Sequence, residues 1–410
     1  MNNDQETQKR SKAVFIYMII VALVGLALGL SDAVWANYFR DAYNVDAWQR
    51  GLIEFPREAP GVLGVFILSG LAFLGDKRLA LISMVLSIIG LVVLGVVTPA
   101  FNVMLIFLFI NSLGMHMFIP LYDSLGMSLA KGGNYGTVMG RFNSVRTAFG
   151  MLAALMVFLG FRSGIFSFMR TPMLNFLIAA ALFAIVFGLF LYLMRLTEDT
   201  KTAKSHFVFR KRYTKYYMLA FLFGIRKQIM FVFAPWVLIE LLGFGADYMA
   251  ILIFIGAGIG VFFLPMVGKW IDKYGPAKIM IIEAAIFIGV YILYAIVSAG
   301  LHHGWFIGIG VTAVIGVAVA INIADRTTMY FGMVRNIYMR SIAVKPEDVT
   351  PTLATGMAVD HVLSIASAVL CGWIWVEFGP HFVFVFAAVL AVANMLVAVS
   401  IKRESREVAE

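Results

Sequence analysis

Residues 268–278 read Gly268-Lys-Trp-Ile-Asp272-Lys273-Tyr-Gly275-Pro-Ala-Lys278, a short polar stretch between two long apolar segments at 248–267 and 277–299. Each apolar segment approaches the roughly 20 residues that a helix needs to cross a bilayer. The two glycines permit a tight turn and a close approach of the flanking helices. The stretch therefore predicts two membrane-spanning helices joined by a tight turn.

The same alternation of apolar segments and short polar connections continues in both directions along the chain. We count twelve apolar segments, at 13–37, 48–74, 79–97, 102–130, 138–161, 172–194, 213–240, 248–267, 277–299, 304–324, 351–376 and 380–401. Of the 410 residues, 61% are hydrophobic and 13% are charged, whereas a soluble domain carries about 45–50% apolar and about 25% charged residues. The sequence predicts an all-α membrane protein with twelve transmembrane helices, and argues against a soluble or disordered chain.

Basic residues indicate the orientation of these helices. The net charge is +9, and the lysines and arginines cluster in alternate connections, among them Arg335, Arg340 and Lys345 after the tenth segment, while Arg50 is one of few on the opposite side. The positive-inside rule places such connections in the cytoplasm. We therefore expect both termini to be cytoplasmic in a multi-pass protein of the cell membrane. The basic residues read as topology signals, so no nucleic-acid partner is expected.

A long basic connection after the sixth segment divides the chain into two halves. We expect an N-terminal six-helix bundle at 1–196, a cytoplasmic linker at 197–212 and a C-terminal six-helix bundle at 213–410. The connection at 268–278 fits the pattern G-x-x-x-D-[RK]-x-G-x-x-[RK]. In this pattern and position the chain resembles the major facilitator superfamily, whose members carry it between their second and third helices and often again between the eighth and ninth.

The N-terminal half departs from that pattern. It reads Gly70-Leu-Ala-Phe-Leu-Gly75-Asp76-Lys77-Arg78, so that Leu74 stands four residues after Gly70 where an aspartate is expected. The fifth segment also lacks the glycine–proline motif of many antiporters of the superfamily. The resemblance nevertheless implies two pseudo-symmetric bundles around a central cavity, with rocking alternating access. It makes segments three, six, nine and twelve peripheral, and these carry no interior charge except Glu283 near one end of the ninth.

Ionisable residues inside membrane spans are costly and are usually functional. Our candidates for binding the substrate or a coupling ion are Asp32, Glu54, Arg57, Glu58, His116, Arg146, Arg226, Lys227, Asp360 and His361. Glu54, Arg57 and Glu58 share one helical face, and we expect Arg57 to pair with Glu54. Since the resemblance brings spans two and eleven together, Arg57 opposite Asp360 and Glu58 near His361 would form a gate. The alternative is a static ion pair that holds the bundles together.

The other interior charges have two interpretations each. Arg226 and Lys227 could bind an anion, or could be neutralised inside the protein by Asp32, Glu54 or Glu58, and we favour the second. Arg146 is a candidate ligand for the substrate. His116 is more often a hydrogen-bonded structural group than a proton carrier. Trp35 is interpreted as an interfacial anchor.

A second set of residues is predicted to form cytoplasmic gates or latches. Asp123 and the pair Asp325-Arg326 lie at the predicted cytoplasmic ends of spans four and ten. An acid near a helix end and a basic partner can connect two helices there. The full set is Asp76, Asp123, Gly268, Asp272, Lys273, Gly275, Lys278, Asp325 and Arg326.

Together these features predict a secondary active transporter, acting as a monomer, that moves a small solute with a proton or another coupling ion. The interior cations favour an organic anion or an amphipathic metabolite. The alternatives are a proton-driven efflux pump for hydrophobic compounds and, in another class, a membrane receptor or sensor with a transporter-like fold. No phosphate-binding loop, cofactor motif or metal-ligand spacing is present, so no enzyme, cofactor or metal is expected. Cys371 is the single cysteine and cannot form an intrachain disulfide.

Overall fold

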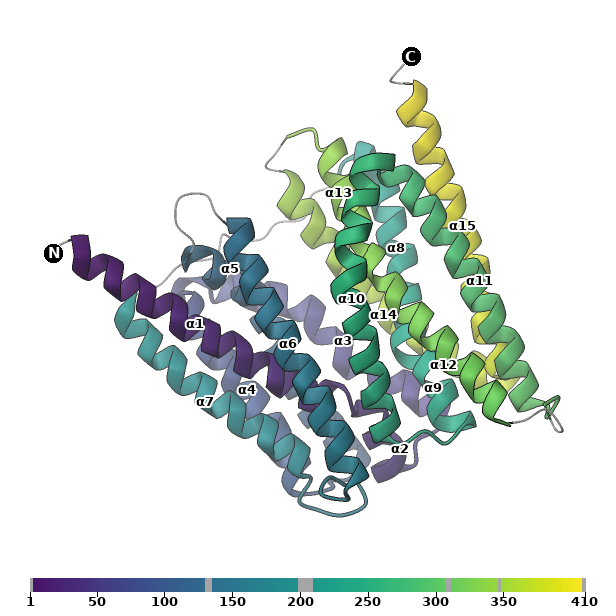
Figure 1. Cartoon of the computed structure of the whole chain (residues 1–410), viewed down its shortest axis with the longest axis horizontal. Coiled ribbons are helices and arrows are strands. Elements are labelled where there is room, and N and C mark those ends of the chain that lie inside the picture. Colours follow the sequence, from purple (N-terminus) through teal and green to yellow (C-terminus); the bar gives the residue numbers. More distant parts are fainter. Residues whose placement is uncertain (1–2, 130–134, 198–208, 307–310, 346–347, 408–410) are drawn as a thin grey trace. The chain divides into compact units, whose positions relative to one another are not determined.

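The computed structural model describes residues 3–129, 135–197, 209–306, 311–345 and 348–407. These residues form helices joined by short connections, and they contain no strand. They divide into two compact units (Figure 1). Because the positions of the units relative to each other are not determined, each unit is described by itself.

The first unit contains most of the N-terminal half. Its helices are α1 (Asn3–Asp32), α2 (Trp35–Tyr43), α4 (Asp76–Val96), α5 (Phe101–Leu129), α6 (Tyr135–Arg162) and α7 (Leu174–Leu196), with α3 (Ala47–Gly70) from Pro56 onward and α10 (Ala246–Tyr274) as far as Phe254. Within it α1 packs against α6 and α7, and α4 packs against α5 and α7. Figure 1 shows α1 and α7 side by side along much of their length.

The second unit contains most of the C-terminal half and the start of α3. Its helices are α8 (Thr214–Gln228), α9 (Ala234–Trp236), α10 (Ala246–Tyr274), α11 (Pro276–His302), α12 (Val311–Thr328), α13 (Met333–Ile342), α14 (Val349–Phe378) and α15 (Pro380–Glu407). Here α8 packs against α14 and α15, and α11 packs against α12 and α15. In both units the first span of the half packs against the fifth and sixth, and the third span packs against the fourth and sixth. The two halves are therefore repeats of one helix arrangement.

Close helix pairs in both units meet at glycines. A Cβ atom on Gly224 of α8 would lie 2.6 Å from the carbonyl oxygen of Asp360 on α14. In the first unit a Cβ on Gly29 of α1 would lie 3.0 Å from the carbonyl oxygen of Gly150 on α6. Small residues allow such backbone contact, which matters in a bilayer because no hydrophobic force drives helices together there.

The turns at Gly75 and Gly275 correspond to each other. Gly75 has φ 87° and ψ 156°, and Gly275 has φ 78° and ψ 156°. Each precedes a new helix, and both φ angles lie in the region that glycine adopts without strain. Aligning these glycines places Arg78 opposite Lys278 and Ala72 opposite Asp272. The expected register, which compared Leu74 with Asp272, was wrong by two residues.

Eleven helices within the described residues are long and apolar enough to cross a membrane. The twelfth span is α3, whose 24 residues include Arg50, Glu54, Arg57 and Glu58. The prediction of twelve helices is thus confirmed. The tenth span was misplaced, because it runs from Thr312 to Ile342 and not from 304 to 324. Asp325 and Arg326 therefore lie near the middle of the span and not at its end.

Candidate functional site

The span that starts with α8 is irregular directly after Arg226 and Lys227. Two π-helical segments, Ile229–Phe233 and Val237–Leu241, flank the single turn of α9. Pro235 lies between them and has no N–H to donate within the helix. Among the eleven apolar helices, this span has the largest buried share: 78% of its most apolar 18-residue stretch lies inside the protein. Charged groups here are therefore costly unless they are paired, and π segments often occur at functional sites.

Arg226 extends from α8 into the interior of the second unit. Its Nη1 lies 4.0 Å from Oδ1 of Asp325 and donates a hydrogen bond to Oγ1 of Thr328 at 3.2 Å. The guanidinium carbon lies 3.7 Å from the ring centre of Phe287 on α11. Arg226 is thus held between an acid of α12 and an aromatic ring, where a desolvated cation–π contact contributes about 2 kcal/mol.

Asp325 has no access to solvent. Neither of its carboxylate oxygens accepts a hydrogen bond of good geometry within the described residues, although the Tyr291 hydroxyl of α11 lies close enough to stabilise the charged form. Besides Arg226 and Tyr291, the groups that interact with it electrostatically are Tyr294 of α11 and its neighbour Arg326. A buried carboxylate with so few hydrogen bonds is costly when it is charged, and a bound proton removes that cost.

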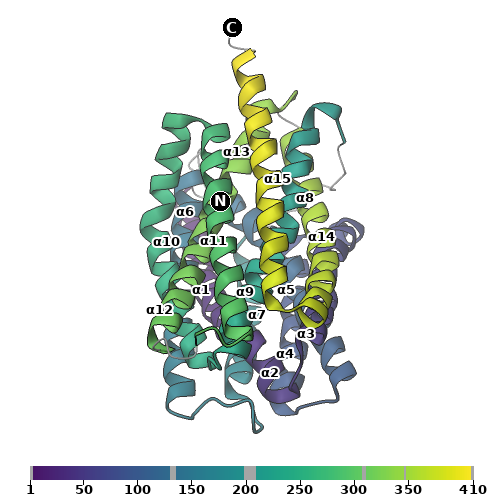
Figure 2. The ribbon, with the colours of Figure 1, turned by 90° about the vertical axis from the view of Figure 1, so that its right-hand side faces the viewer.

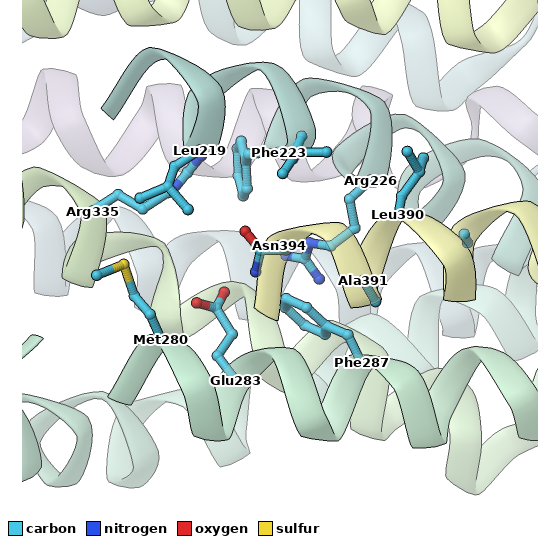
Figure 3. Close-up of a pocket in the computed structure, with 12 residues that line it drawn as sticks. Leu219, Phe223, Arg226, Met280, Glu283, Phe287, Arg335, Leu390, Ala391 and Asn394 are labelled. Atoms are coloured by element: carbon cyan, nitrogen blue, oxygen red, sulfur yellow. The ribbon is translucent and has the colours of Figure 1, made fainter. Parts of the chain in front are cut away.

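Glu283 and Arg335 complete this group from two other helices. Glu283 on α11 is 4% exposed and interacts electrostatically with Arg226 and Arg335. The guanidinium carbon of Arg335 on α13 lies 3.3 Å from the ring centre of Phe223. Figure 3 shows the Glu283 carboxylate pointing toward Asn394 of α15, with Arg226 reaching the same space from α8. We call Arg226, Glu283, Asp325 and Arg335 the Arg226 network.

The Arg226 network encloses little free space. The cavity that Arg226, Glu283 and Arg335 line has a volume of about 20 Å³, enough for about one water molecule. Solute sites usually measure about 300–1,000 Å³. The network therefore has room for a proton and a water molecule, and no room for an organic substrate.

Lys227 points away from this network and pairs with a different acid. Its Nζ lies 3.1 Å from Oδ1 of Asp360, which also accepts a hydrogen bond from Ser364 at 3.2 Å. Both cations are thus neutralised inside the protein, as we favoured from the sequence. Asp325 and Asp360 are the acids that pair with them within the same unit. The predicted pairings with Asp32, Glu54 and Glu58 stay predictions.

The charges of α3 also pair differently from the prediction. Glu54 forms a buried ion pair with Arg50, one turn earlier, and both side chains are almost inaccessible. The pairing with Arg50 was not expected, since Arg50 was interpreted as a topology signal, and the expected pairing of Glu54 with Arg57 stays a prediction. Arg57 and Glu58 are half-buried, and the Arg57 carbonyl accepts a hydrogen bond from Oγ of Ser112 at 2.5 Å.

Three further candidates lie on α1 and α5 of the first unit. Oδ1 of Asp32 accepts a hydrogen bond from Nε1 of Trp35 at 3.2 Å, and Asp32 interacts electrostatically with Arg57. Trp35 is 3% exposed and stacks on Phe176, so it is a core residue and not an interfacial anchor. Nδ1 of His116 lies 2.9 Å from the carbonyl oxygen of Ser112. This contact fits the structural interpretation of His116.

Arg146 on α6 lies beside two groups of α5. Its guanidinium carbon is 4.9 Å from the ring centre of Tyr122, and it interacts electrostatically with Asp123. Asp123 is exposed and lies in the last two turns of α5, in contrast to Asp325 at mid-span. The two acids therefore do not occupy corresponding places of the two halves, contrary to the prediction.

The predicted latches differ between the two turns. Asp76 is buried and accepts a hydrogen bond from Oγ of Ser124 at 2.5 Å, while Lys77 donates to the carbonyl of Thr197 at 2.6 Å. The N-terminal turn thus connects α4 to α5 and to the end of α7. In the second unit Asp272, Lys273 and Lys278 are exposed, and both lysines lie over the ring of Tyr274. Gly268 lies on α10, one turn before Asp272.

His361 is half-buried on α14, next to Asp360. The predicted gate joins Arg57 with Asp360 and Glu58 with His361, which belong to different units. Both pairings stay predictions.

The end of the predicted linker is attached to the start of α14. Arg210 contacts Asp348 through two nitrogens, at 2.9 Å and 3.1 Å. The hydroxyl of Tyr213 donates to Oδ2 of Asp348 at 2.7 Å and accepts from the backbone N–H of Val344 at 2.9 Å. The Tyr213 hydrogen bond and the Arg210 charge hold the pKa of the Asp348 carboxyl below its ordinary value. Asp348 thus joins the end of the linker to the start of α14 through its contacts with Arg210 and Tyr213.

Replacing Asp348 with Asn is expected to lower the melting temperature at neutral pH. Because the pKa of Asp348 is lowered in the folded state, its stabilising effect is complete above the ordinary carboxyl pKa of about 3.9 and is lost as the pH falls through the lower folded-state value. The difference in melting temperature between the two proteins should therefore be constant near pH 7 and should narrow as the pH falls below about 3.9. A difference that stays constant with pH would contradict this assignment.

Two members of the Arg226 network were missed in the sequence. Glu283 was assigned to the end of a peripheral helix, and Arg335 to a connection that is in fact the helix α13. One feature of the sequence could have indicated that Glu283 has a buried basic partner. A single acid in an otherwise uncharged span needs a buried cation as its partner.

Comparison with known proteins places this geometry in context. The profile of the Major Facilitator Superfamily matches residues 17–343. Among solved structures, a mutant of the nucleoside transporter NupG is similar over 95% of this chain and 99% of its own, with 18% identity and a TM-score of 0.73. A D-xylose–proton symporter matches over 94% and 97%, with 16% identity and a TM-score of 0.67. A POT family transporter in complex with 5-aminolevulinic acid matches over 97% of both chains, with 13% identity and a TM-score of 0.74. No match was found among curated proteins.

Proposed function

Because the chain belongs to the Major Facilitator Superfamily, we propose that it is a proton-coupled secondary transporter whose coupling element is the Arg226 network. It moves a small solute by alternating access. Residues 1–196 and 213–410 act as the two rocking bundles, and both termini face the cytoplasm.

One observation carries the proposal of proton coupling. Asp325 is fully buried, accepts no hydrogen bond of good geometry within the described residues, and has a guanidinium 4.0 Å away. When Asp325 is charged it attracts Arg226 together with Glu283, and when Asp325 is protonated Arg226 loses its nearest acid and Glu283 remains as its charged partner. A proton thus changes the pairing inside one bundle, which is the kind of bistable contact that a ligand or proton can shift.

The substrate is bound elsewhere than in this network, because the cavity there is too small for it. We propose a small organic anion or amphipathic metabolite. The interior cations Arg146 and Lys227 support this choice, since each is half-buried and an anion could compete for it with a protein partner.

A second candidate function is the export of hydrophobic compounds. An open apolar groove of about 660 Å³ lies between α8, α14 and α15 and is lined among others by Tyr217, Phe221, Val359 and Leu396. Phe221 and Leu396 are 44% and 66% exposed, so the groove is open to its surroundings, and its volume falls in the range of sites for drug-sized molecules. Efflux of hydrophobic dyes that Phe221→Ser slows would favour this function over uptake of an anion.

Flux measurements in proteoliposomes test the proposed function. We expect that an inward or outward pH gradient drives accumulation of at least one organic anion from a broad panel, and that a protonophore abolishes it. The absence of gradient-dependent flux for every solute tested would overturn the proposal.

Arg57→Ala and Asp360→Ala are each expected to reduce transport at least tenfold while membrane insertion is retained. Both residues belong to the proposed gate, and Asp360→Ala also removes the ion-pair partner of Lys227. Initial uptake rates, normalised to protein in the membrane, are the measurement. The matched control is Glu377→Gln, an exposed acid on the same helix as Asp360. Normal transport in both alanine variants would exclude the gate.

A further inference from the structure

Three of the six histidines of the chain lie together in the second unit. His302 ends α11, His303 follows it, and His381 is the second residue of α15. The ring centres are 4.9 Å apart for His302 and His303, 5.3 Å for His303 and His381, and 6.2 Å for His302 and His381. Figure 2 shows α11 and α15 running side by side, which brings these distant residues together.

Two of these separations match what one metal ion requires. Three imidazoles that bind a tetrahedral ion, with metal–nitrogen distances of about 2.0–2.1 Å, have their ring centres about 5 Å apart. The distances from His303 to the other two rings are within a few tenths of an ångström of that value, whereas the His302 and His381 rings are 6.2 Å apart. A three-histidine site therefore requires His302 and His381 to come closer together.

Gly379 keeps a space free between two of the rings. A Cβ atom at this position would lie 3.2 Å from Nδ1 of His381 and 3.6 Å from Nε2 of His302. Both nitrogens thus border the same small space beside the glycine. Its φ of 104° is a conformation that residues with a side chain rarely adopt, so the backbone here also favours an empty position.

His381 supplies an unsatisfied nitrogen. Its Nδ1 is shielded from solvent and has no hydrogen-bond partner within the described residues. A shielded polar nitrogen without a partner carries an energetic penalty, which a bound cation would remove. His302 and His303 are exposed, and His303 stacks on Trp305 with ring centres 5.7 Å apart. An ion can therefore reach the cluster from solvent.

In the described residues the three nitrogens do not converge within one coordination sphere. The His302 and His303 side chains are exposed, as is Trp305, on which His303 stacks, so we expect a bound ion to draw both rings toward Nδ1 of His381. Neutral imidazoles suit Zn²⁺, Cu²⁺ and Ni²⁺, whereas Mg²⁺ and Ca²⁺ prefer oxygen ligands.

We propose that His302, His303 and His381 form a binding site for a divalent transition-metal ion, with Zn²⁺ as the reference ion. The ion joins the end of α11 to the start of α15, and thereby stabilises their contact. This site is separate from the proposed coupling element, so its test does not depend on transport.

Calorimetric titration of the purified protein with Zn²⁺, after removal of any oligohistidine tag, tests the proposal. We expect one ion per chain at pH 7.5, with affinity at least tenfold weaker in His303→Ala and in His381→Ala. Affinity should also fall between pH 7.5 and pH 5.5, because protons compete for imidazole nitrogens. Mg²⁺ should not bind at the same site.

The matched control is His206→Ala, a histidine of the predicted linker, which should bind Zn²⁺ like the unmodified chain. Circular dichroism of each variant without metal verifies that the fold is retained. No binding by the unmodified chain would overturn the proposal. Unchanged affinity in both cluster variants, or loss of binding in His206→Ala, would overturn it as well.

Discussion

Replacing Asp325 with Asn is expected to abolish the dependence of transport on a pH gradient while the protein stays folded. Asparagine has nearly the same shape but cannot take up or release a proton, so Arg226 keeps one pairing at every pH. The amide can still accept a hydrogen bond from the Tyr291 hydroxyl, but it no longer compensates the charge of Arg226. We therefore expect at least a hundredfold loss of gradient-driven accumulation, together with a lower melting temperature than that of the unmodified chain.

The measurement is accumulation of the solute in proteoliposomes with and without a pH gradient. Glu377→Gln is the matched control, since it makes the same chemical change at an exposed acid of the second unit. Gradient-driven accumulation by Asp325→Asn at the normal level would show that the coupling proton binds elsewhere. Glu283 would then be the next residue to test, because it is the other acid of the Arg226 network.

The sequence was sufficient to predict the helices and their repeat because both depend on local patterns. Apolar segments of bilayer length indicate spans whatever their partners are. The turn at Gly275 could be found from its glycines and charges. The register of the corresponding turn at Gly75 could be assigned only from the structure. Gly75 has the same backbone conformation as Gly275, and Arg78 corresponds to Lys278, but Ala72 stands where the second half has Asp272.

The pairing of buried charges was less predictable from the sequence. Glu54 has a cation three residues later and another four residues earlier, and both spacings lie on one helical face. The choice of Arg50 depends on which side of α3 is buried, which is a tertiary property. The run Asp325-Arg326-Thr-Thr was interpreted as the polar end of a span, because the sequence alone does not show that these side chains face the protein interior. The helix continues there because these side chains point into the unit, where Arg226 and Asn322 are their partners.

Replacing Arg226 with Met is expected to give the largest loss of stability among the single substitutions considered. Methionine can fill the space over Phe287, but two buried acids then share only Arg335 and Arg326 as nearby cations. Removing one partner of a buried ion pair typically costs about 3–5 kcal/mol, because the other charge is left uncompensated. Unfolding of the purified protein, followed by circular dichroism in mixed micelles of increasing denaturing detergent, measures this loss.

The double variant Arg226→Met/Asp325→Asn separates the loss of charge pairing from the loss of packing. Removing both charges leaves no uncompensated pair, so most of the stability should return although transport should not. Arg226→Met/Glu377→Gln is the matched double variant, and it should be as unstable as Arg226→Met because Glu377 is exposed. Equal instability of both double variants would mean that Arg226 stabilises the unit through its contacts with Phe287 and Thr328 and not through Asp325. Neutral residues can often replace a buried ion pair without loss of stability. If the double variant is stable but does not transport, the charges of Arg226 and Asp325 are therefore needed for coupling and not for folding.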